Sequence, residues 1–307
     1  MIVADIKRIL CPVDFSEFSR HAFDHAVAVA RSHKAEITLL HVSPIAVPAD
    51  QFAYAPVTLP EAERNRMLRC LATLAESEGS RDVPVHCAVR EGIDIHDEVL
   101  QAADAVDADL IVLGTHGRSG FQHLVLGSVT EKILRKARCP VLTVPRRAPD
   151  AVPAGAALYR RIMCGVDFSD CSLAALDFVW SLASRTEAHI DAVSVLQLVP
   201  MIEQSSAVTL YYPGLTDELR ADVGTRLESL VLEARVRGYD VDAVTAVGSP
   251  YEELLRLAKV RRADLIVMGV HGRGPLDRLF FGSTTNHVVR QAECPVLTVR
   301  TKEQRHG

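Results

Sequence analysis

Glycine and hydroxyl residues recur at a fixed spacing in two places along the chain. Residues 114–128 have the pattern G-x2-G-x9-G-S, and residues 269–283 repeat it. In each copy an apolar run precedes the pattern and a helix-like segment follows it. Glycine lets the backbone approach a ligand closely, and the free N–H groups at the start of a helix attract anions. The two stretches therefore predict two sites for phosphate groups.

Each residue of the pattern has a role in this prediction. The first two glycines allow a sharp turn at the strand end, the third presents amide groups at the helix start, and the hydroxyls add donors. These residues are Gly114, Gly117, Gly127, Ser128 and Thr130 in the first copy, and Gly269, Gly272, Gly282, Ser283, Thr284 and Thr285 in the second. Glycines also end strands and serines also cap helices without a ligand, so a purely structural loop is the alternative.

Basic side chains lie inside the same two loops. Arg118 and Arg273 each follow a glycine in the string H-G-R, where a guanidinium can pair with phosphate or remain solvated. His116 and His271 can donate to a phosphate or pack beneath the loop. Neither histidine belongs to a cluster with the spacing of metal ligands, so we predict no metal site.

Two aspartates share the setting V-D-F-S at the end of a predicted strand. Asp14 and Asp167 can accept hydrogen bonds from the two hydroxyls of a ribose. Alternatively, each carboxylate makes a turn with the serine two residues later or caps the next helix. Val42 and Val195 end the second strand of each copy, where they line an adenine pocket or belong to the core.

The elements that must position these residues alternate between strands and helices. In the first copy we expect strands at 8–13, 36–42, 83–89, 109–114 and 140–144, and helices at 16–33, 60–77, 95–105 and 128–137. The second copy has expected strands near 160–166, 190–195, 240–246, 264–269 and 295–299. Right-handed crossovers then predict an α/β fold of two tandem, doubly wound, five-stranded parallel sheets in the order 3-2-1-4-5. Ligands bind at the switch point between strands 1 and 4.

The two copies have the length of whole domains. Residues 107–146 align on 262–301 without a gap, and 21 of these 40 positions are identical. Residues 146–157 are rich in Ala and Pro and lack apolar periodicity, as is typical of a linker. We assign a first nucleotide-binding domain to 1–146, a linker to 147–157, a second nucleotide-binding domain to 158–301 and a tail to 302–307.

Composition limits the partners and the compartment. The net charge is −5 and no long basic run occurs, so we expect neither nucleic acid nor a membrane as partner. No apolar run approaches the roughly 18–20 residues of a membrane helix, and the N-terminus has no signal core. The seven cysteines contain no C-x-x-C pair and are expected to be reduced, buried core thiols. Together these features predict a cytoplasmic protein.

The motifs resemble those of the universal stress protein family in its tandem, two-domain form. The shared motifs are V-D-F-S, D-L-I-V-[LM]-G, the G-x2-G-x9-G-S loop and a final C-P-V-L-T-V strand. The resemblance covers nearly the whole chain apart from the linker, the loops after the second strands and the tail. Its glycine motif is similar to that of the ATP-binding branch. It implies a fold like the adenine-nucleotide alpha-hydrolases, with ATP and Mg²⁺ as ligands.

The resemblance also implies contacts that spacing does not. It adds Pro12, Val13 and Val129 to the first site, and Gly165 and Val166 to the second. Because Pro12 becomes Gly165, equal affinity of the two sites does not follow. Family members dimerise through the last strand, so 141–144 and 296–299 are expected to pair as an intramolecular pseudo-dimer. A homodimer is a further option.

Three functions are compatible with these features. The first is an ATP-binding regulatory protein of the stress response with little or no turnover, because no P-loop lysine or obvious general base accompanies the loops. The second is a slow ATPase or self-phosphorylating enzyme with Ser128 or Ser283 as acceptor. The third is a scaffold or small-molecule carrier. In this third case the aromatic residues of the long loops either bind a partner or cover the domain interface. They are Phe52, Tyr54, Tyr211 and Tyr212. The sequence does not separate ATP from AMP or a cyclic nucleotide.

Overall fold

Two similar halves make up the chain. The computed structural model describes residues 5–45, 59–77, 79–115, 126–150, 158–184, 186–197, 213–271 and 282–301. The first half has strands β1 (Arg8–Pro12), β2 (Glu36–Pro44), β3 (Val85–Gly92), β4 (Leu110–Gly114) and β5 (Val141–Val144), and helices α1 (Glu17–His33), α2 (Glu61–Ala75), α3 (Ile95–Ala105) and α4 (Ser128–Lys136). The second half has β6 (Arg161–Gly165), β7 (His189–Leu196), β8 (Val241–Val247), β9 (Leu265–Gly269) and β10 (Val296–Val299), and helices α5 (Asp170–Ala183), α6 (Pro213–Val236), α7 (Pro250–Arg261) and α8 (Ser283–Gln291).

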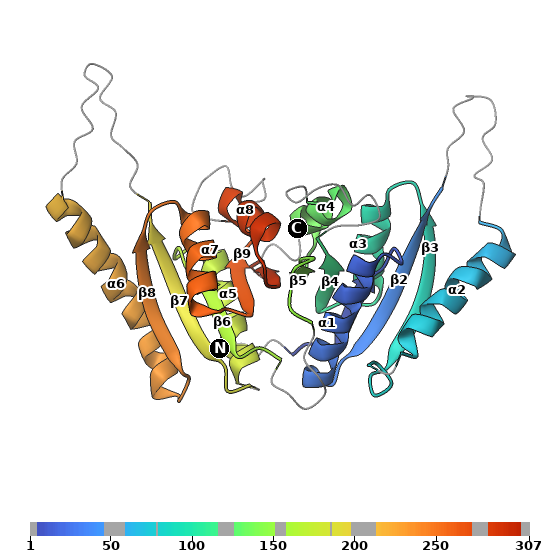
Figure 1. The fold of residues 1–307 in the computed structure, drawn as a ribbon, viewed down its shortest axis with the longest axis horizontal. Helices are drawn as coiled ribbons and strands as arrows, with labels where there is room; N and C mark the ends of the chain where they lie inside the picture. The colour runs from blue at the N-terminus through green and yellow to red at the C-terminus, as the bar shows by residue number, and fades with distance from the viewer. Residues whose placement is uncertain are drawn as a thin grey trace, which may run out of the picture.

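The strands form a single sheet in the order β3-β2-β1-β4-β5-β10-β9-β6-β7-β8. Each half thus has the predicted order 3-2-1-4-5, with parallel neighbours. The two predicted five-stranded units lie side by side (Figure 1), and their last strands pair with each other, which joins them into one sheet. Apolar edge strands leave unpaired backbone groups that favour such pairing.

The central pair, β5 and β10, is antiparallel and confirms the expected pairing of 141–144 with 296–299. Thr143 Oγ1 donates to the Val296 carbonyl oxygen over 3.1 Å, and Thr298 Oγ1 donates to that of Val141 over 3.2 Å. These reciprocal bonds are what a pseudo-two-fold arrangement of two homologous strands requires.

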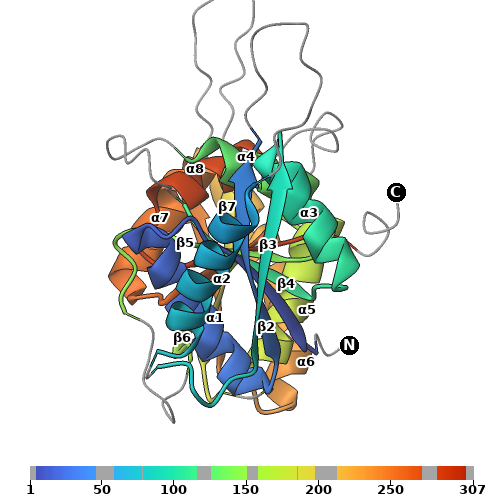
Figure 2. The same cartoon turned by 90° about the vertical axis from the view of Figure 1, so that its right-hand side faces the viewer.

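Helices cover both faces of the sheet, and each face has its own buried core. One core includes residues of α1, α2, α5 and α6, and the other includes residues of α3, α4, α7 and α8. Both cores contain residues from the two halves. Helices α4 and α8 lie side by side at the upper end of the molecule in both views (Figures 1 and 2). The two helices that follow the glycine loops therefore meet at the junction of the halves.

The start of the predicted linker packs against the first half. His21 Nε2 donates to the Ala148 carbonyl oxygen over 3.2 Å, and His25 Nε2 donates to that of Pro149 over 3.1 Å. Ala148 is buried in the core. Burial lowers the pKa of His25 to about 4, reinforced by the charge of His21. The described residues 147–150 are thus held by α1.

All seven cysteines are free thiols. Cys11, Cys164, Cys171 and Cys294 are buried as expected, but Cys70 on α2 is exposed, and Cys87 and Cys139 are half-buried. Burial raises the pKa of the Cys11 and Cys164 thiols, which makes them poor nucleophiles. The expectation of seven core thiols was wrong for Cys70, because α2 is mostly exposed and buries only Leu71 fully.

Candidate functional site

A cavity of about 440 Å³ opens at the C-terminal ends of β6, β7 and β9 in the second half. Small-molecule sites commonly measure roughly 300–1,000 Å³, and open α/β sheets bind ligands at this edge. Nine residues that the sequence singles out line the cavity, namely Gly165, Val166, Asp167, Val195, Gly269, His271, Ser283, Thr284 and Thr285. Gly282 directly precedes α8, whereas Gly272 and Arg273 lie outside the described residues. The fold therefore gathers side chains that are far apart in sequence.

One edge of the cavity is the first turn of α8. The helix starts after Gly282, which provides no side-chain cap, and Ser283 is exposed there. Helix α5 differs, because the Ser169 hydroxyl accepts a hydrogen bond from the Ser172 amide. A Cβ at Gly282 would lie 3.1 Å from the Val270 carbonyl oxygen, which explains the glycine. An uncapped helix start beside a cavity is suited to bind an anion.

The threonines of the pattern hold the helix starts against the strands. Thr285 Oγ1 donates to the Gly269 carbonyl oxygen over 2.9 Å, and Thr130 Oγ1 donates to that of Gly114 over 3.0 Å. Both threonines are buried. Their hydroxyl protons are already used, so they position the site, and Ser283 offers the more accessible hydroxyl.

Both aspartates make a turn with the serine two residues later, which is one of the two interpretations of the V-D-F-S motif. Asp167 Oδ1 accepts from the amide and the hydroxyl of Ser169 over 3.0 and 2.6 Å. Asp14 Oδ1 accepts from the same groups of Ser16 over 3.0 and 2.5 Å. Asp167 also lines the cavity. The turn orients the carboxylate and is compatible with a ribose contact.

A strained phenylalanine follows each aspartate. Phe15 and Phe168 have φ angles of 65° and 62°, a left-handed conformation that is rare for large side chains. The ring of Phe15 lies 4.5 Å from that of His41, and the Arg226 guanidinium carbon lies 4.3 Å from the centre of the Phe168 ring. Strain of this kind concentrates at ligand sites, and here it recurs in both halves. Sequence analysis did not single out these two residues.

The first half places its predicted residues at the equivalent points of the fold. Pro12 ends β1 and Gly114 ends β4, and the residues next to these elements are Val13, Asp14, Gly127, Ser128, Val129 and Thr130. Val42 is buried inside β2, which continues to Pro44, so the prediction that Val42 ends the strand was wrong. Other residues that the sequence singled out also lie outside the described part, namely His116, Gly117, Arg118, Phe52, Tyr54, Tyr211 and Tyr212.

The two halves differ beside the second strand. His41 Nδ1 donates to the Val13 carbonyl oxygen over 2.8 Å, and its ring is buried. The strand registers place Ser194 at the equivalent position of β7, where it lines the cavity. An imidazole fills space that a hydroxymethyl group leaves open. The second half therefore has more room at this point.

Arg300, directly after β10, is a residue that sequence analysis did not assign. Its Nη1 donates to Nε2 of His271 over 3.1 Å, and its Nη2 donates to the carbonyl oxygens of Leu134 and Arg135 in α4. Burial lowers the pKa of this guanidinium, which still carries its charge at neutral pH. The only clue in the sequence is that the first copy has Pro145 at the equivalent position.

A larger cavity of about 890 Å³ lies between the halves and contains none of the predicted residues. Its lining carries both signs of charge, including Arg8, Lys136, Asp109 and Asp177. Much of this charge is paired, since Arg8 lies 3.5 Å from Asp107 and Arg138 lies 3.6 Å from Asp104, all four of which line the cavity. We therefore place the candidate site in the smaller cavity.

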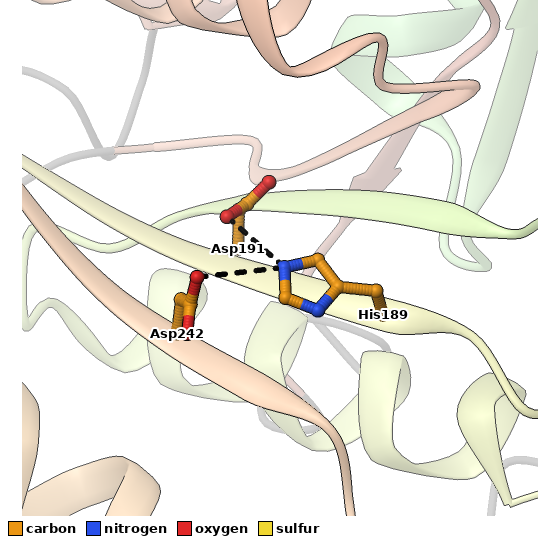
Figure 3. A group of neighbouring side chains, drawn as sticks. All are labelled: His189, Asp191 and Asp242. Atoms are coloured by element: carbon orange, nitrogen blue, oxygen red, sulfur yellow. Dashed lines mark ion pairs between the residues drawn. The ribbon is translucent and has the colours of Figure 1, made fainter.

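His189, Asp191 and Asp242 form a cluster with the donor types of a metal site (Figure 3). Sequence spacing did not reveal it, because its members come from two neighbouring strands. Arg261 Nη1 lies 2.6 Å from Asp191 Oδ1 and 3.4 Å from Asp242 Oδ2. The guanidinium already supplies positive charge to both carboxylates, so the cluster is explained as an ion-pair network at the edge opposite the candidate site.

Among the helices that the structure describes, none is long and apolar enough to cross a membrane.

Comparisons with known proteins agree with this architecture. The sequence model of the universal stress protein family matches residues 5–145 and 158–300. A universal stress protein of Methanocaldococcus jannaschii is 34% identical over 46% of this chain and 82% of its own length, and one of Mycolicibacterium smegmatis is 27% identical over 96% and 97%. The crystal structure of a universal stress protein from Archaeoglobus fulgidus has the same fold, with a TM-score of 0.65 at 19% identity over 95% and 96% of the two chains. This chain therefore belongs to the universal stress protein family, with two domains of that family in tandem.

Proposed function

We propose that the protein is an ATP-binding regulator of the stress response, with one adenine-nucleotide site in each domain and little or no turnover. The observation that carries the proposal is the second-half cavity, which joins Asp167, the end of β9 and the uncapped start of α8. The proposal includes Mg²⁺ bound with the phosphates and a cytoplasmic location. Domain boundaries of 1–146 and 158–301 are part of it.

The cavity offers a separate surface to each part of a nucleotide. Val166 and Val195 supply apolar contact for a base, and Asp167 supplies an acceptor for ribose hydroxyls. Ser283 and the amides of the first turn of α8 face the phosphates. Because Thr285 holds this turn against β9, a hydrogen bond within the protein fixes the position of the phosphate edge.

A regulatory role follows from where the phosphate edges lie. Helices α4 and α8 adjoin each other, and Arg290 on α8 lies 3.2 Å from Glu131 on α4. A ligand acts on a protein by favouring the conformation that it binds better. ATP at either helix start would therefore bear on the junction between the domains, where a partner can detect the change.

The test introduces a carboxylate at each phosphate edge. Ser283→Glu and Ser128→Glu place a negative charge at exposed helix starts, where acidic residues are tolerated. The control Gln291→Glu adds the same charge at the other end of α8. Titration of Mg–ATP by calorimetry should give two sites for the wild type and the control, one for each single variant and none for the double variant.

Unchanged stoichiometry in Ser128→Glu/Ser283→Glu would refute the assignment of the phosphate edges. No ATP binding by the wild type would refute the proposed function itself. The same samples separate regulator from enzyme, because sustained ADP release that is lost in the double variant would identify an ATPase. Phosphate transfer to Ser128 or Ser283, followed by mass spectrometry, would identify self-phosphorylation.

A further inference from the structure

The contact between Arg300 and His271 defines the state of the imidazole. A guanidinium has only donors, so His271 Nε2 accepts the 3.1 Å hydrogen bond from Arg300 Nη1. The ring is therefore neutral in this arrangement, with its proton on Nδ1. His271 is buried and lines the second-half cavity. Any hydrogen bond that the ring donates must come from Nδ1.

The second terminal nitrogen of the Arg300 guanidinium contacts the first half. Arg300 Nη2 donates to the Leu134 carbonyl oxygen over 3.0 Å and also to that of Arg135. These carbonyls belong to the last turn of α4, where helix carbonyls have no partner within the helix and where positive charge is favourable. Arg300 thus caps α4 from the opposite domain. The first turn of α4 is the phosphate edge of the first half.

Among the residues that the structure describes, this link is present on one side of the pseudo-two-fold only. The gap-free alignment of 107–146 with 262–301 places Pro145 at the position of Arg300. Proline has no side-chain donor, so Pro145 cannot make the hydrogen bonds that Arg300 makes. Pro145 directly follows β5 and Arg300 directly follows β10, and both strands have the sequence V-L-T-V. The asymmetry therefore lies in this side chain and not in the backbone that carries it.

We infer that Arg300 is a positioning residue that links the two nucleotide sites. It fixes the tautomer of His271, which lines the second site, and it holds α4, which forms the phosphate edge of the first. The ligand class, a nucleotide polyphosphate, rests on the proposed function. The link between His271 and α4 rests on hydrogen bonds alone.

The first test needs only the wild-type protein and one assignment variant. Nitrogen-detected NMR of imidazole side chains distinguishes the two neutral tautomers, and His271→Gln identifies the signal of His271. We expect the Nδ1–H tautomer at neutral pH. A signal of the Nε2–H tautomer would overturn the inference without any variant of Arg300. This measurement requires no nucleotide, so it is independent of whether ATP binds.

The second test measures what Arg300 contributes to the second site. In the Ser128→Glu background, which leaves one site for Mg–ATP, Arg300→Met should weaken binding about tenfold, as expected for loss of a charge-assisted hydrogen bond network. Arg290→Met is the matched control, because Arg290 also crosses between the halves but contacts Glu131 and Asn286. It should change binding less than about twofold.

Arg300→Lys serves as a second variant that keeps the charge. A single ammonium group cannot reproduce both planar edges of the guanidinium, so the tautomer of His271 should become mixed. Equal weakening by Arg300→Met and Arg290→Met, or an unchanged His271 tautomer in both Arg300 variants, would show that Arg300 only stabilises the domain junction. Either result would overturn the inference.

Discussion

The two halves have the same bonds at the base of the candidate site and different side chains around it. The Asp–Ser turn and the Thr bond to the strand end have lengths that agree within 0.1 Å between the halves. By contrast, His41 is replaced by Ser194, Pro12 by Gly165 and Pro145 by Arg300. The shared bonds indicate what any site at this switch point needs. The replaced residues indicate how the two sites differ from each other.

All three replacements make the site of the second half more open or connect it to the first half. Ser194 and Gly165 line the second cavity and are smaller than their counterparts. Arg300 connects this cavity to α4. The first half has the linker contacts instead, since His21 and His25 hold residues 148 and 149, whereas the equivalent residues on α5 are Ala174 and Phe178. The halves share a fold but differ in the side chains that surround the equivalent sites.

The largest effect is expected from a methyl group at Gly269. A Cβ there would lie 2.8 Å from backbone and Cβ atoms of Cys171 and the amide of Ser172, so α5 must shift. Overpacking against a backbone costs about 3 kcal/mol. Gly165→Ala is the control, because its Cβ would lie 3.5 Å from Leu254 and should cost less than about 0.5 kcal/mol. Urea unfolding measures both.

The shape of the Gly269→Ala transition also tests how independent the halves are. One shifted transition would show that the continuous sheet unfolds as a unit, as β5–β10 pairing suggests. A separate early transition of the second half would show that the central pair does not couple the two domains. Equal costs for Gly269→Ala and Gly165→Ala would contradict the packing described here.

The second prediction concerns acid stability and His25, whose counterpart in the second half is Phe178. The folded-state pKa of His25 is lowered from 6.5 to about 4, mainly by burial. Between these values the unfolded chain binds a proton that the folded chain does not, so stability falls as the pH drops. The loss should reach about 3 kcal/mol near pH 4.

His25→Phe makes the first half resemble the second and should remove this acid sensitivity. It should also cost about 1 kcal/mol at neutral pH, because the hydrogen bond to the Pro149 carbonyl is lost. Thermal unfolding across pH 4–7 measures both effects. His86→Phe is the control for the substitution itself, since its side chain is 66% exposed and lies away from the linker contacts. An identical pH profile for wild type and His25→Phe would refute the assignment.

The sequence predicted most of the fold because repeats and periodicity are local properties. Strand and helix positions agreed with the structure within a few residues. The single sheet was less predictable, since it depends on whether two edge strands of one chain meet. The sequence V-L-T-V indicated that they could, but only the structure shows the Thr143 and Thr298 bonds that connect them.

The candidate site was predictable where its residues belong to a repeated pattern. Asp167, Gly269 and Ser283 were found because each has a counterpart in the first half. Arg300 was missed because it has none. The roles of Thr130 and Thr285 were also inaccessible, because a hydroxyl that donates to a strand-end carbonyl and one that faces a ligand look the same in sequence.

The smallest predicted effect would make the junction symmetric. Arg290 lies 3.2 Å from Glu131 across the halves, but the counterpart of Glu131 is Asn286, so Arg135 has no equivalent carboxylate to reach on α8. Asn286→Glu would supply one and should stabilise the protein by about 0.5 kcal/mol, with Asn286→Gln as the uncharged control. Because Arg135 is 46% exposed and position 286 is half-buried, about 1 M salt should abolish the gain in urea unfolding. A gain that survives high salt, or that Asn286→Gln shares, would mean that packing and not charge distinguishes the two helices.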